Sequence, residues 1–202
     1  MPQEPIPSVT DLRFSIPMEP QLSITEHAVL GILSEGPSHG FAISKELGPG
    51  GPVGRILTVR RSLTYRALDR LVDLELAEPI HREPGDSGPQ RIIHWITPVG
   101  RRHLNKWLGQ PVEHIRDMRI EFQLKLCFLS RSGKSSLDLI RKQRSALDPT
   151  LSALEGTADP PVDHLELWRQ HNAAAAAAYL DHLIELSVMP GSDQRDRPDS
   201  PG

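Results

Sequence analysis

The 202-residue sequence predicts a mainly α-helical protein with one small β-hairpin near its middle. The first observation is periodicity: over most of residues 22–188, apolar residues recur every three or four positions, as on one face of a helix. The second is the segment 77–100, in which β-prone residues flank the turn sequence "PGDSGP". The third concerns the two ends, 1–20 and 190–202. They are rich in proline and polar residues, have no periodicity, and are expected to be disordered tails.

Three short helices are expected in the first half of the chain. The first, "ITEHAVLGILSEG", has Thr25 as its expected N-cap, and the second, "HGFAISKEL", is expected to be capped by Ser38. The third runs from about Ser62 to Leu76. It follows a glycine-rich stretch at 48–54, which is expected to be a loose linker, and a β-branched stretch at 55–59, which is expected to be a short strand.

A β-hairpin and a fourth helix complete this half. The segments "EPIHRE" and "RIIHWIT" are its two expected strands. Thr97 is the expected N-cap of the next helix, and Pro98 takes its first position, where a missing N–H is harmless. Helix, helix, helix, hairpin, helix is the order of a winged helix-turn-helix domain, which we place at residues 21–110.

The second half is expected to be entirely helical, over about 112–130, 135–155 and 161–188. The last of these segments contains six consecutive alanines, which favour a helix and allow another helix to approach closely. These helices have more apolar positions than a small bundle facing one winged domain should need. We therefore expect residues 111–189 to form a helical dimerisation domain, although a self-contained helical domain is the alternative.

Charge is distributed unevenly along the chain. The formal net charge is −3, but residues 55–106 hold ten Lys or Arg against six Asp or Glu, so this segment carries +4 and the remainder −7. Arginines gather at the start of the third helix, at Arg60, Arg61 and Arg66, while Asp69 and Asp73 lie toward its end. A solvated helix face is the plain explanation of such charges. Their position favours DNA instead, because the third helix of this domain type places its N-terminal residues in the major groove.

Four motifs in the expected order resemble those of the PadR family of bacterial transcription regulators. They are "GPSHGF" at 36–41, "LTYRALDRLVDLEL" at 63–76, "IHWITPVG" at 93–100 and "FQLKLCFL" at 122–129. The resemblance covers about residues 22–187. Two departures stand out: Glu75 occupies a position usually held by glycine, and Arg60 stands where a Ser or Thr cap is common.

The resemblance implies a homodimer, built by the C-terminal helices, that reads palindromic operator DNA as a regulator, here taken to be a repressor. The family also responds commonly to small aromatic or amphipathic effectors between the DNA-binding and dimerisation helices. Four aromatic residues are the candidates for lining such a site here: Trp107, Phe122, Phe128 and Trp168.

Twelve residues are the expected DNA contacts. Arg60, Arg61, Ser62, Thr64, Tyr65 and Arg66 are assigned to the major groove, Ser38, His39 and Lys45 to phosphates, and Arg82, Gln90 and Arg91 to the wing. Tyr65 could equally be a core residue with its hydroxyl turned toward a phosphate. The rival hypothesis is a winged-helix protein–protein interaction module without sequence-specific DNA binding.

Other classes of function find little support in the sequence. The single cysteine, Cys127, excludes an internal disulfide framework and a cysteine-based zinc site. His164, His171 and His182 are expected to be surface or packing residues, so no metal and no cofactor are expected. The chain shows neither a nucleophile elbow nor a glycine-rich phosphate loop, so it is not expected to be an enzyme. With no secretory signal and no apolar run of roughly 20 residues, we expect a cytoplasmic protein.

Overall fold

The computed structural model describes residues 20–84, 90–155 and 163–188. The expected tails, apart from Pro20, lie outside this part of the chain, as does most of the predicted hairpin turn. No helix in the described ranges is both long and apolar enough to cross a membrane.

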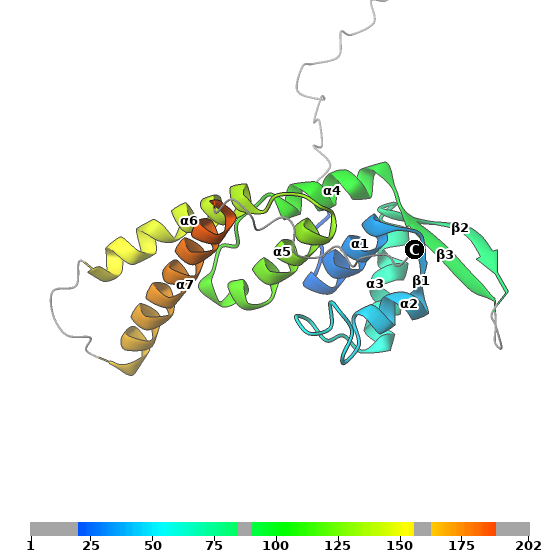
Figure 1. Ribbon diagram of the computed structural model, residues 1–202. Coiled ribbons are helices and arrows are strands. Elements are labelled where there is room, and N and C mark those ends of the chain that lie inside the picture. The colour runs from blue at the N-terminus through cyan, green and yellow to red at the C-terminus, as the bar shows by residue number, and fades with distance from the viewer. Residues whose placement is uncertain (1–19, 85–89, 156–162, 189–202) are drawn as a thin grey trace, which may run out of the picture.

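The winged helix-turn-helix prediction is confirmed, and a separate pair of helices extends away from that domain (Figure 1). The β2–β3 hairpin projects at one end of the molecule, α6 and α7 form the other end, and α4 and α5 lie between them. The elements are α1 (Ile24–Glu35), β1 (Ser38–His39), α2 (Gly40–Glu46), α3 (Arg61–Asp73), β2 (Ala77–Glu83), β3 (Arg91–Ile96), α4 (Pro98–Leu108), the 3₁₀ helix η2 (Ile115–Arg119), α5 (Glu121–Arg131), α6 (Leu137–Glu155) and α7 (His164–Val188).

The first helix begins two residues earlier than the sequence suggested. Ser23, and not Thr25, is its N-cap, and it forms a capping box with Glu26. The Glu26 backbone N–H donates to Ser23 Oγ at 3.3 Å, and the Ser23 N–H donates to Glu26 Oε2 at 2.7 Å. This reciprocal pair satisfies two backbone donors that a Thr25 cap would leave open.

The sheet contains a strand that the sequence analysis assigned to the wrong residues. Its order is β1-β3-β2, and β1 pairs antiparallel with β3 through Ser38 opposite His94 and His39 opposite Ile93. Residues 55–59 form no strand, so that prediction was wrong. Ser38 is a strand residue, and the N-cap of α2 is His39, whose Nδ1 accepts a hydrogen bond from the Ala42 N–H at 3.1 Å.

The glycine-rich segment before α3 is a compact turn, not the loose linker expected from its composition. Val53 is fully buried in it, and the Gly54 N–H donates to the Glu46 carbonyl oxygen at 2.8 Å. A Cβ on Gly54 would lie 1.9 Å from the Gly48 carbonyl oxygen, so the turn requires glycine there. Its tight packing sets where α3 begins relative to α2.

Helix α3 starts at an uncapped residue and ends in a well-formed cap. Arg60 is the N-cap and makes no side-chain capping bond, while Thr58 donates instead to the Gly54 carbonyl oxygen at 2.7 Å. At the other end Glu75 has a left-handed φ of 57°. The Leu76 N–H donates to the Leu71 carbonyl oxygen and the Glu75 N–H to that of Val72, at 2.9 Å each, which is the Schellman pattern.

The apolar core runs without interruption from the winged domain into α5. Phe122 is fully buried and Phe128 is 2% exposed. A Cβ on Gly31 of α1 would lie 2.5 Å from the Phe128 ring, so the two helices approach closely because that residue is glycine. The single helix expected over 112–130 is in fact η2 followed by α5.

The last two helices are confirmed and pack mainly on each other (Figure 1). Ala173, Ala177 and Leu180 are the buried residues of α7, so the alanine run supplies the close approach to α6 that its small side chains allow. Arg144 of α6 donates to Asp181 of α7 at 2.8 Å. Pro149 lies inside α6.

Candidate nucleic-acid interface

The N-terminal half of α3 presents a basic, solvent-exposed face. Arg60, Arg61, Ser62 and Arg66 are all exposed. The opposite face buries Ala67, Leu68 and Leu71 against the core, mainly against α1 and α2. The apolar residues thus fix the helix on the domain and leave its arginines directed to solvent.

Thr64 does not belong to this exposed face, and its assignment to the major groove is withdrawn. Its side chain is fully buried, and its Oγ1 lies 3.5 Å from the Arg60 carbonyl oxygen, where it donates back along the helix. Thr64 follows Arg60 by four positions and precedes Leu68 by four, so it shares the buried helix face with Leu68.

Aromatic side chains lie beside the arginines at the junction of α2 and α3. The Phe41 ring, 37% exposed, has the Arg61 Cζ 5.0 Å from its centroid and the Lys45 Nζ at the same distance. The Arg61 Cζ is also 5.6 Å from the Tyr65 ring centroid. Tyr65 is half-buried, and a Cβ on Gly40 would lie 2.7 Å from its ring. Tyr65 therefore combines a packing role with a place on this face.

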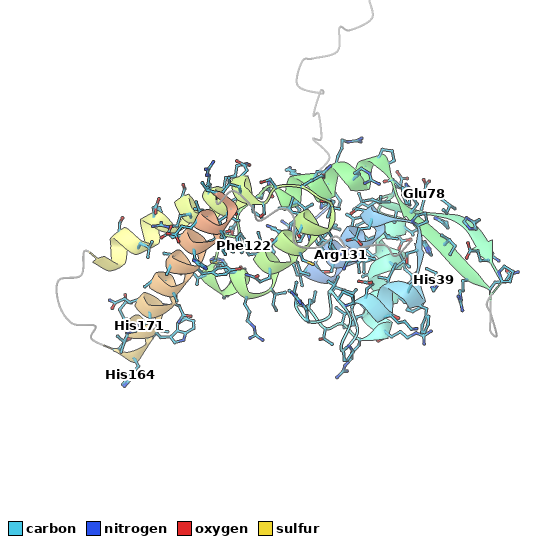
Figure 2. All side chains as sticks on the ribbon, in the orientation of Figure 1. His39, Glu78, Phe122, Arg131, His164 and His171 are labelled. Atoms are coloured by element: carbon cyan, nitrogen blue, oxygen red, sulfur yellow. The ribbon has the colours of Figure 1, made fainter. Side chains whose placement is uncertain are left out.

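The three residues expected on phosphates occupy different surroundings. His39, labelled in Figure 2, uses Nδ1 to cap α2 and stacks on Phe41 with ring centroids 6.3 Å apart, which leaves only Nε2 for a ligand. Ser38 is half-buried in β1, whereas Lys45 is exposed.

Two of the three wing residues, Gln90 and Arg91, line a cleft between α3 and β3. Arg82 and Gln90 are exposed and Arg91 is half-buried. The cleft measures about 360 Å³, and Arg61, Tyr65, Gln90 and Arg91 are among the residues that line it. The structure therefore brings side chains of the third helix and of the wing to one surface, as the sequence analysis expected. The predicted contacts themselves stay predictions.

His94 of β3 lines the same cleft. Its Nδ1 is buried and has no hydrogen-bond partner among the described residues. Burial lowers the pKa of His94 below its usual value, so the ring is the neutral form at neutral pH. It adds no positive charge to this surface.

Comparison with known proteins identifies the domain just described. Residues 29–106 match the model of the Transcriptional regulator PadR-like family, a stretch that runs from α1 to α4 and includes the basic helix and the wing. These residues belong to the PadR-like family. The resemblance drawn from the sequence motifs is confirmed over this range, while the "FQLKLCFL" motif lies beyond it.

Three solved structures are similar to about four fifths of the chain and share little sequence with it. Bacillus subtilis PadR in complex with operator DNA is 21% identical, covers 81% of this chain and 99% of its own, and has a TM-score of 0.41. Bacillus subtilis PadR alone is 19% identical, over 84% of this chain and 97% of its own, with a TM-score of 0.38. The protein smu.1604c from Streptococcus mutans UA159 is 16% identical, over 79% and 98%, with a TM-score of 0.39. No curated protein matches.

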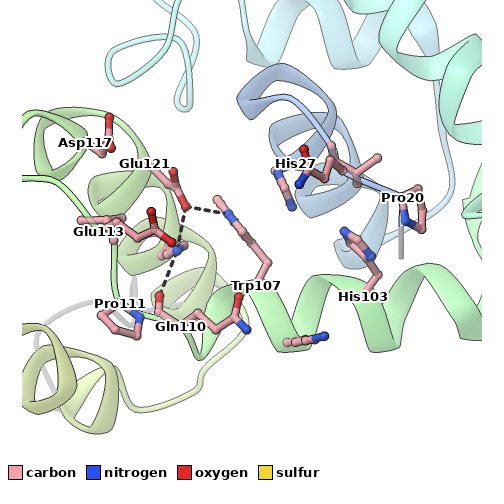
Figure 3. Close-up of a pocket in the computed structure, with 14 residues that line it drawn as sticks. Pro20, His27, His103, Trp107, Gln110, Pro111, Glu113, Asp117 and Glu121 are labelled. Carbon is pink, nitrogen blue, oxygen red and sulfur yellow. Dashed lines mark hydrogen bonds and ion pairs between the residues drawn. The ribbon is translucent and has the colours of Figure 1, made fainter. Parts of the chain in front are cut away.

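The four aromatic residues expected around an effector are not brought together. Phe122 and Phe128 are core residues, and Trp168 is 60% exposed on α7. Trp107 lines a cavity of about 600 Å³ where the PadR-like domain meets η2 and α5 (Figure 3), and the other three residues do not line it. The polar residues of this cavity could not be found from the sequence, because they come from α1, α4, η2, α5 and the segments beside them and share no sequence pattern.

A buried charged network forms one wall of this cavity (Figure 3). The Trp107 Nε1–H donates to Glu121 at 2.9 Å, and the same carboxylate oxygen lies 2.8 Å from the Lys125 ammonium. Lys125 is 1% exposed and also donates to the Gln110 carbonyl oxygen at 2.9 Å. Burial lowers the pKa of Lys125, and the hydrogen bond with Glu121 partly opposes that shift. The carboxylate therefore compensates a buried charge.

A stack of rings from α1 and α4 adjoins this network and shares Trp107 with it. His27 lies 4.4 Å from the Trp107 ring and 5.6 Å from His103, centroid to centroid. Its Nδ1 is 3.2 Å from the Ser23 carbonyl oxygen. Burial is the main reason that the pKa of His27 falls to about 4, and the nearby His103 lowers it further. The cavity thus combines a charged network with a ring stack in which His27 is neutral at neutral pH.

The described residues hold no group of three or more His, Cys, Asp or Glu placed to bind a metal ion. His164 and His171 lie at the end of α7 farthest from the PadR-like domain (Figure 2). His182 lies 3.7 Å from Glu185 on the same helix. Cys127 is half-buried, and burial raises the pKa of its thiol, so it is not an activated nucleophile.

Proposed function

We propose that this PadR-like protein is a transcriptional repressor that binds double-stranded operator DNA as a homodimer. The observation that carries the proposal is the exposed N-terminal half of α3, where Arg60, Arg61 and Arg66 face solvent beside the wing. A helix presented in this way by a winged domain enters the major groove with its first turns against the base edges.

Each group of exposed side chains has a distinct role in this proposal. Arg60, Arg61, Ser62, Tyr65 and Arg66 contact the major groove. Lys45 of α2 and the β1 residues Ser38 and His39 contact phosphates, and such contacts fix the register of the protein on DNA without reading its sequence. The wing residues Arg82, Gln90 and Arg91 lie along the adjacent backbone.

The C-terminal helices supply the dimer interface, with residues 21–110 as the DNA-binding domain and 111–189 as the dimerisation domain. Large apolar side chains of α7 remain exposed, among them Leu165, Trp168 and Leu186, at 53%, 60% and 46%. A second copy covering them removes apolar surface from water. Two copies of α3 about 34 Å apart would then read a palindrome.

A small-molecule effector releases the protein from DNA in this proposal. The cavity beside Trp107 is the site that supports it, because it lies where α5 meets the DNA-binding domain. Of the four aromatic residues first considered, only this one is retained as a lining residue.

Fluorescence anisotropy with a duplex from the promoter of the protein's own gene tests the proposal. We expect salt-sensitive binding, since phosphate contacts release counterions, and a large loss of affinity in the variant Arg60→Ala/Arg66→Ala. Arg119→Ala, an exposed arginine of η2, is the matched control and should bind normally. Reduced transcription from that promoter in a purified system establishes repression.

The absence of salt-sensitive binding to any duplex at micromolar protein would refute DNA recognition. If the double arginine variant then kept a protein partner captured by the wild type, the chain would be a protein–protein interaction module. Sedimentation tests the dimer separately: Trp168→Glu should yield a monomer whose circular dichroism is unchanged.

A further inference from the structure

The arginines of α3 fall into two kinds according to what surrounds them. The Arg61 guanidinium lies over two rings, those of Phe41 and Tyr65, which we call the aromatic platform. Arg60 and Arg66 make no ion pair, hydrogen bond or ring contact through their side chains with any residue that the structure describes. Arg70, farther along, forms an ion pair with Glu26 at 3.4 Å and donates to the Gln21 carbonyl oxygen at 3.3 Å.

The aromatic platform is itself fixed by the fold. Gly40 lets the start of α2 approach the Tyr65 ring more closely than any residue with a Cβ would allow. His39 stacks on the other ring of the platform, Phe41, and is held in place by its capping bond to Ala42. The two rings therefore present a preformed surface to Arg61 in the absence of DNA.

An arginine held over aromatic rings differs physically from one that moves freely in water. The cation–π attraction restricts its rotamers, so less conformational entropy is lost when it binds. Its N–H groups remain available for two parallel hydrogen bonds, which is the geometry that the O6 and N7 atoms of guanine accept. A mobile arginine is better suited to a phosphate, which accepts contacts from many directions.

We propose that Arg61 is the residue of α3 that reads a guanine, and that Phe41 and Tyr65 are the positioning residues that hold its guanidinium for that contact. The proposal rests on the DNA binding proposed above and adds to it one base and one specificity-determining side chain. Arg60 and Arg66, which flank the major groove in the proposed complex, then contact the phosphates that border it and contribute affinity that is independent of sequence.

The test removes one hydrogen-bond acceptor at a time from the DNA. In the promoter duplex each guanine is replaced in turn by 7-deazaguanine, which keeps Watson–Crick pairing but lacks the N7 acceptor. Wild-type protein should lose about tenfold in affinity at one guanine of each half-site, because one hydrogen bond from a charged group is worth about that much. Arg61→Ala, which has no donor for guanine, should bind the unmodified duplex at least tenfold more weakly and show no further loss at that guanine. Arg66→Ala, the matched control, should respond to 7-deazaguanine as the wild type does.

The platform is tested by two further variants. Phe41→Leu should weaken binding to the promoter duplex several-fold. Its affinity for a scrambled duplex, and the salt dependence of that affinity, should be the same as in the wild type. Tyr65→Phe keeps the ring and is the matched control, so its response to 7-deazaguanine should be that of the wild type. Thermal melts by circular dichroism confirm that each variant is folded.

The outcomes separate this proposal from the one on which it rests. Salt-sensitive binding to the promoter duplex would leave DNA binding intact in either of two outcomes that refute base reading by Arg61. In the first, Arg61→Ala keeps the full response to 7-deazaguanine. In the second, no guanine responds at all. If no duplex is bound, both proposals are refuted. If Phe41→Leu weakens promoter and scrambled duplexes equally, the platform has no positioning role.

Discussion

Thr97 donates a hydrogen bond from its Oγ1 to the carbonyl oxygen of Glu75 at 2.8 Å, which ties the start of α4 to the turn that follows α3. Thr97 Oγ1 also accepts a hydrogen bond from the Gly100 N–H at 3.0 Å and so caps α4. Glu75 is the one non-glycine residue with a positive φ in the described part of the chain. The turn into the wing is therefore made without glycine, and the cap of the next helix holds it in place.

Replacing Glu75 by glycine should stabilise the fold. A left-handed conformation costs an L-residue about 1–2 kcal/mol, and glycine avoids this cost but loses about 0.5–1 kcal/mol through its more flexible unfolded chain. We expect Glu75→Gly to raise the free energy of unfolding by about 0.5–1 kcal/mol in urea denaturation. Asp73→Gly, in the last turn of α3, should lower it by about 0.3 kcal/mol, because glycine is a slightly poorer helix former than aspartate. Equal destabilisation by both variants would contradict this account of the turn.

Thr64 should be dispensable for DNA binding. Its side chain is fully buried, so Thr64→Val, which keeps the shape, should bind the promoter duplex within about twofold of the wild type. The exposed neighbour Ser62 offers its hydroxyl to solvent, and Ser62→Ala should lose about 1 kcal/mol, or roughly fivefold in affinity, in the same anisotropy assay. Loss of binding in folded Thr64→Val would return this residue to the interface.

The parts of the fold that could be predicted are those encoded within a few residues of each other. Thr97 and Pro98 mark the start of α4 through local capping chemistry, and the hairpin follows from its turn and strand residues. Strand β1 could not be found in this way, because its two residues are a strand only through pairing with β3.

The candidate site shows the same division between local and tertiary information. The arginines of α3 can be found in the sequence, but the sequence does not show that only Arg61 among the first three lies over aromatic rings. The contact of Arg61 with Phe41 depends on how α2 packs on α3, and so does the close approach of Gly40 to Tyr65. The burial of Phe122 likewise depends on α5 packing against the winged domain, which no pattern around that residue indicates.

Arg131 should couple α5 to the DNA-binding domain. Its guanidinium lies 2.6 Å from Glu35 of α1 and 3.1 Å from Glu46 of α2. All three side chains are less than one third exposed, so we expect Arg131→Gln to lower the free energy of unfolding by about 1–2 kcal/mol. A double-mutant cycle with Glu35→Gln measures the interaction. A coupling energy near zero would show that the contact is not stabilising.

His27 should make the stability of the protein depend on pH. Burial between Trp107 and His103 lowers its pKa from 6.5 to about 4, so the folded state keeps the ring neutral at a pH where the unfolded chain binds a proton. Its folded pKa is the lower one, so its contribution to stability is complete above the unfolded pKa and is lost as the pH falls from about 6.5 toward about 4. The other charged groups facing it, Glu121 and Lys125, act in opposite directions on this pKa.

Urea denaturation at two pH values measures this contribution. Between about pH 7 and about pH 5, the wild type should lose about 2 kcal/mol more of its free energy of unfolding than His27→Gln does, because glutamine does not titrate. His171→Gln on the exposed surface of α7 is the matched control and should follow the wild type. If His27→Gln and the wild type lost the same free energy over this interval, the buried ring would carry its proton in the folded state. The stack with Trp107 would then have to accommodate a cation beside Lys125.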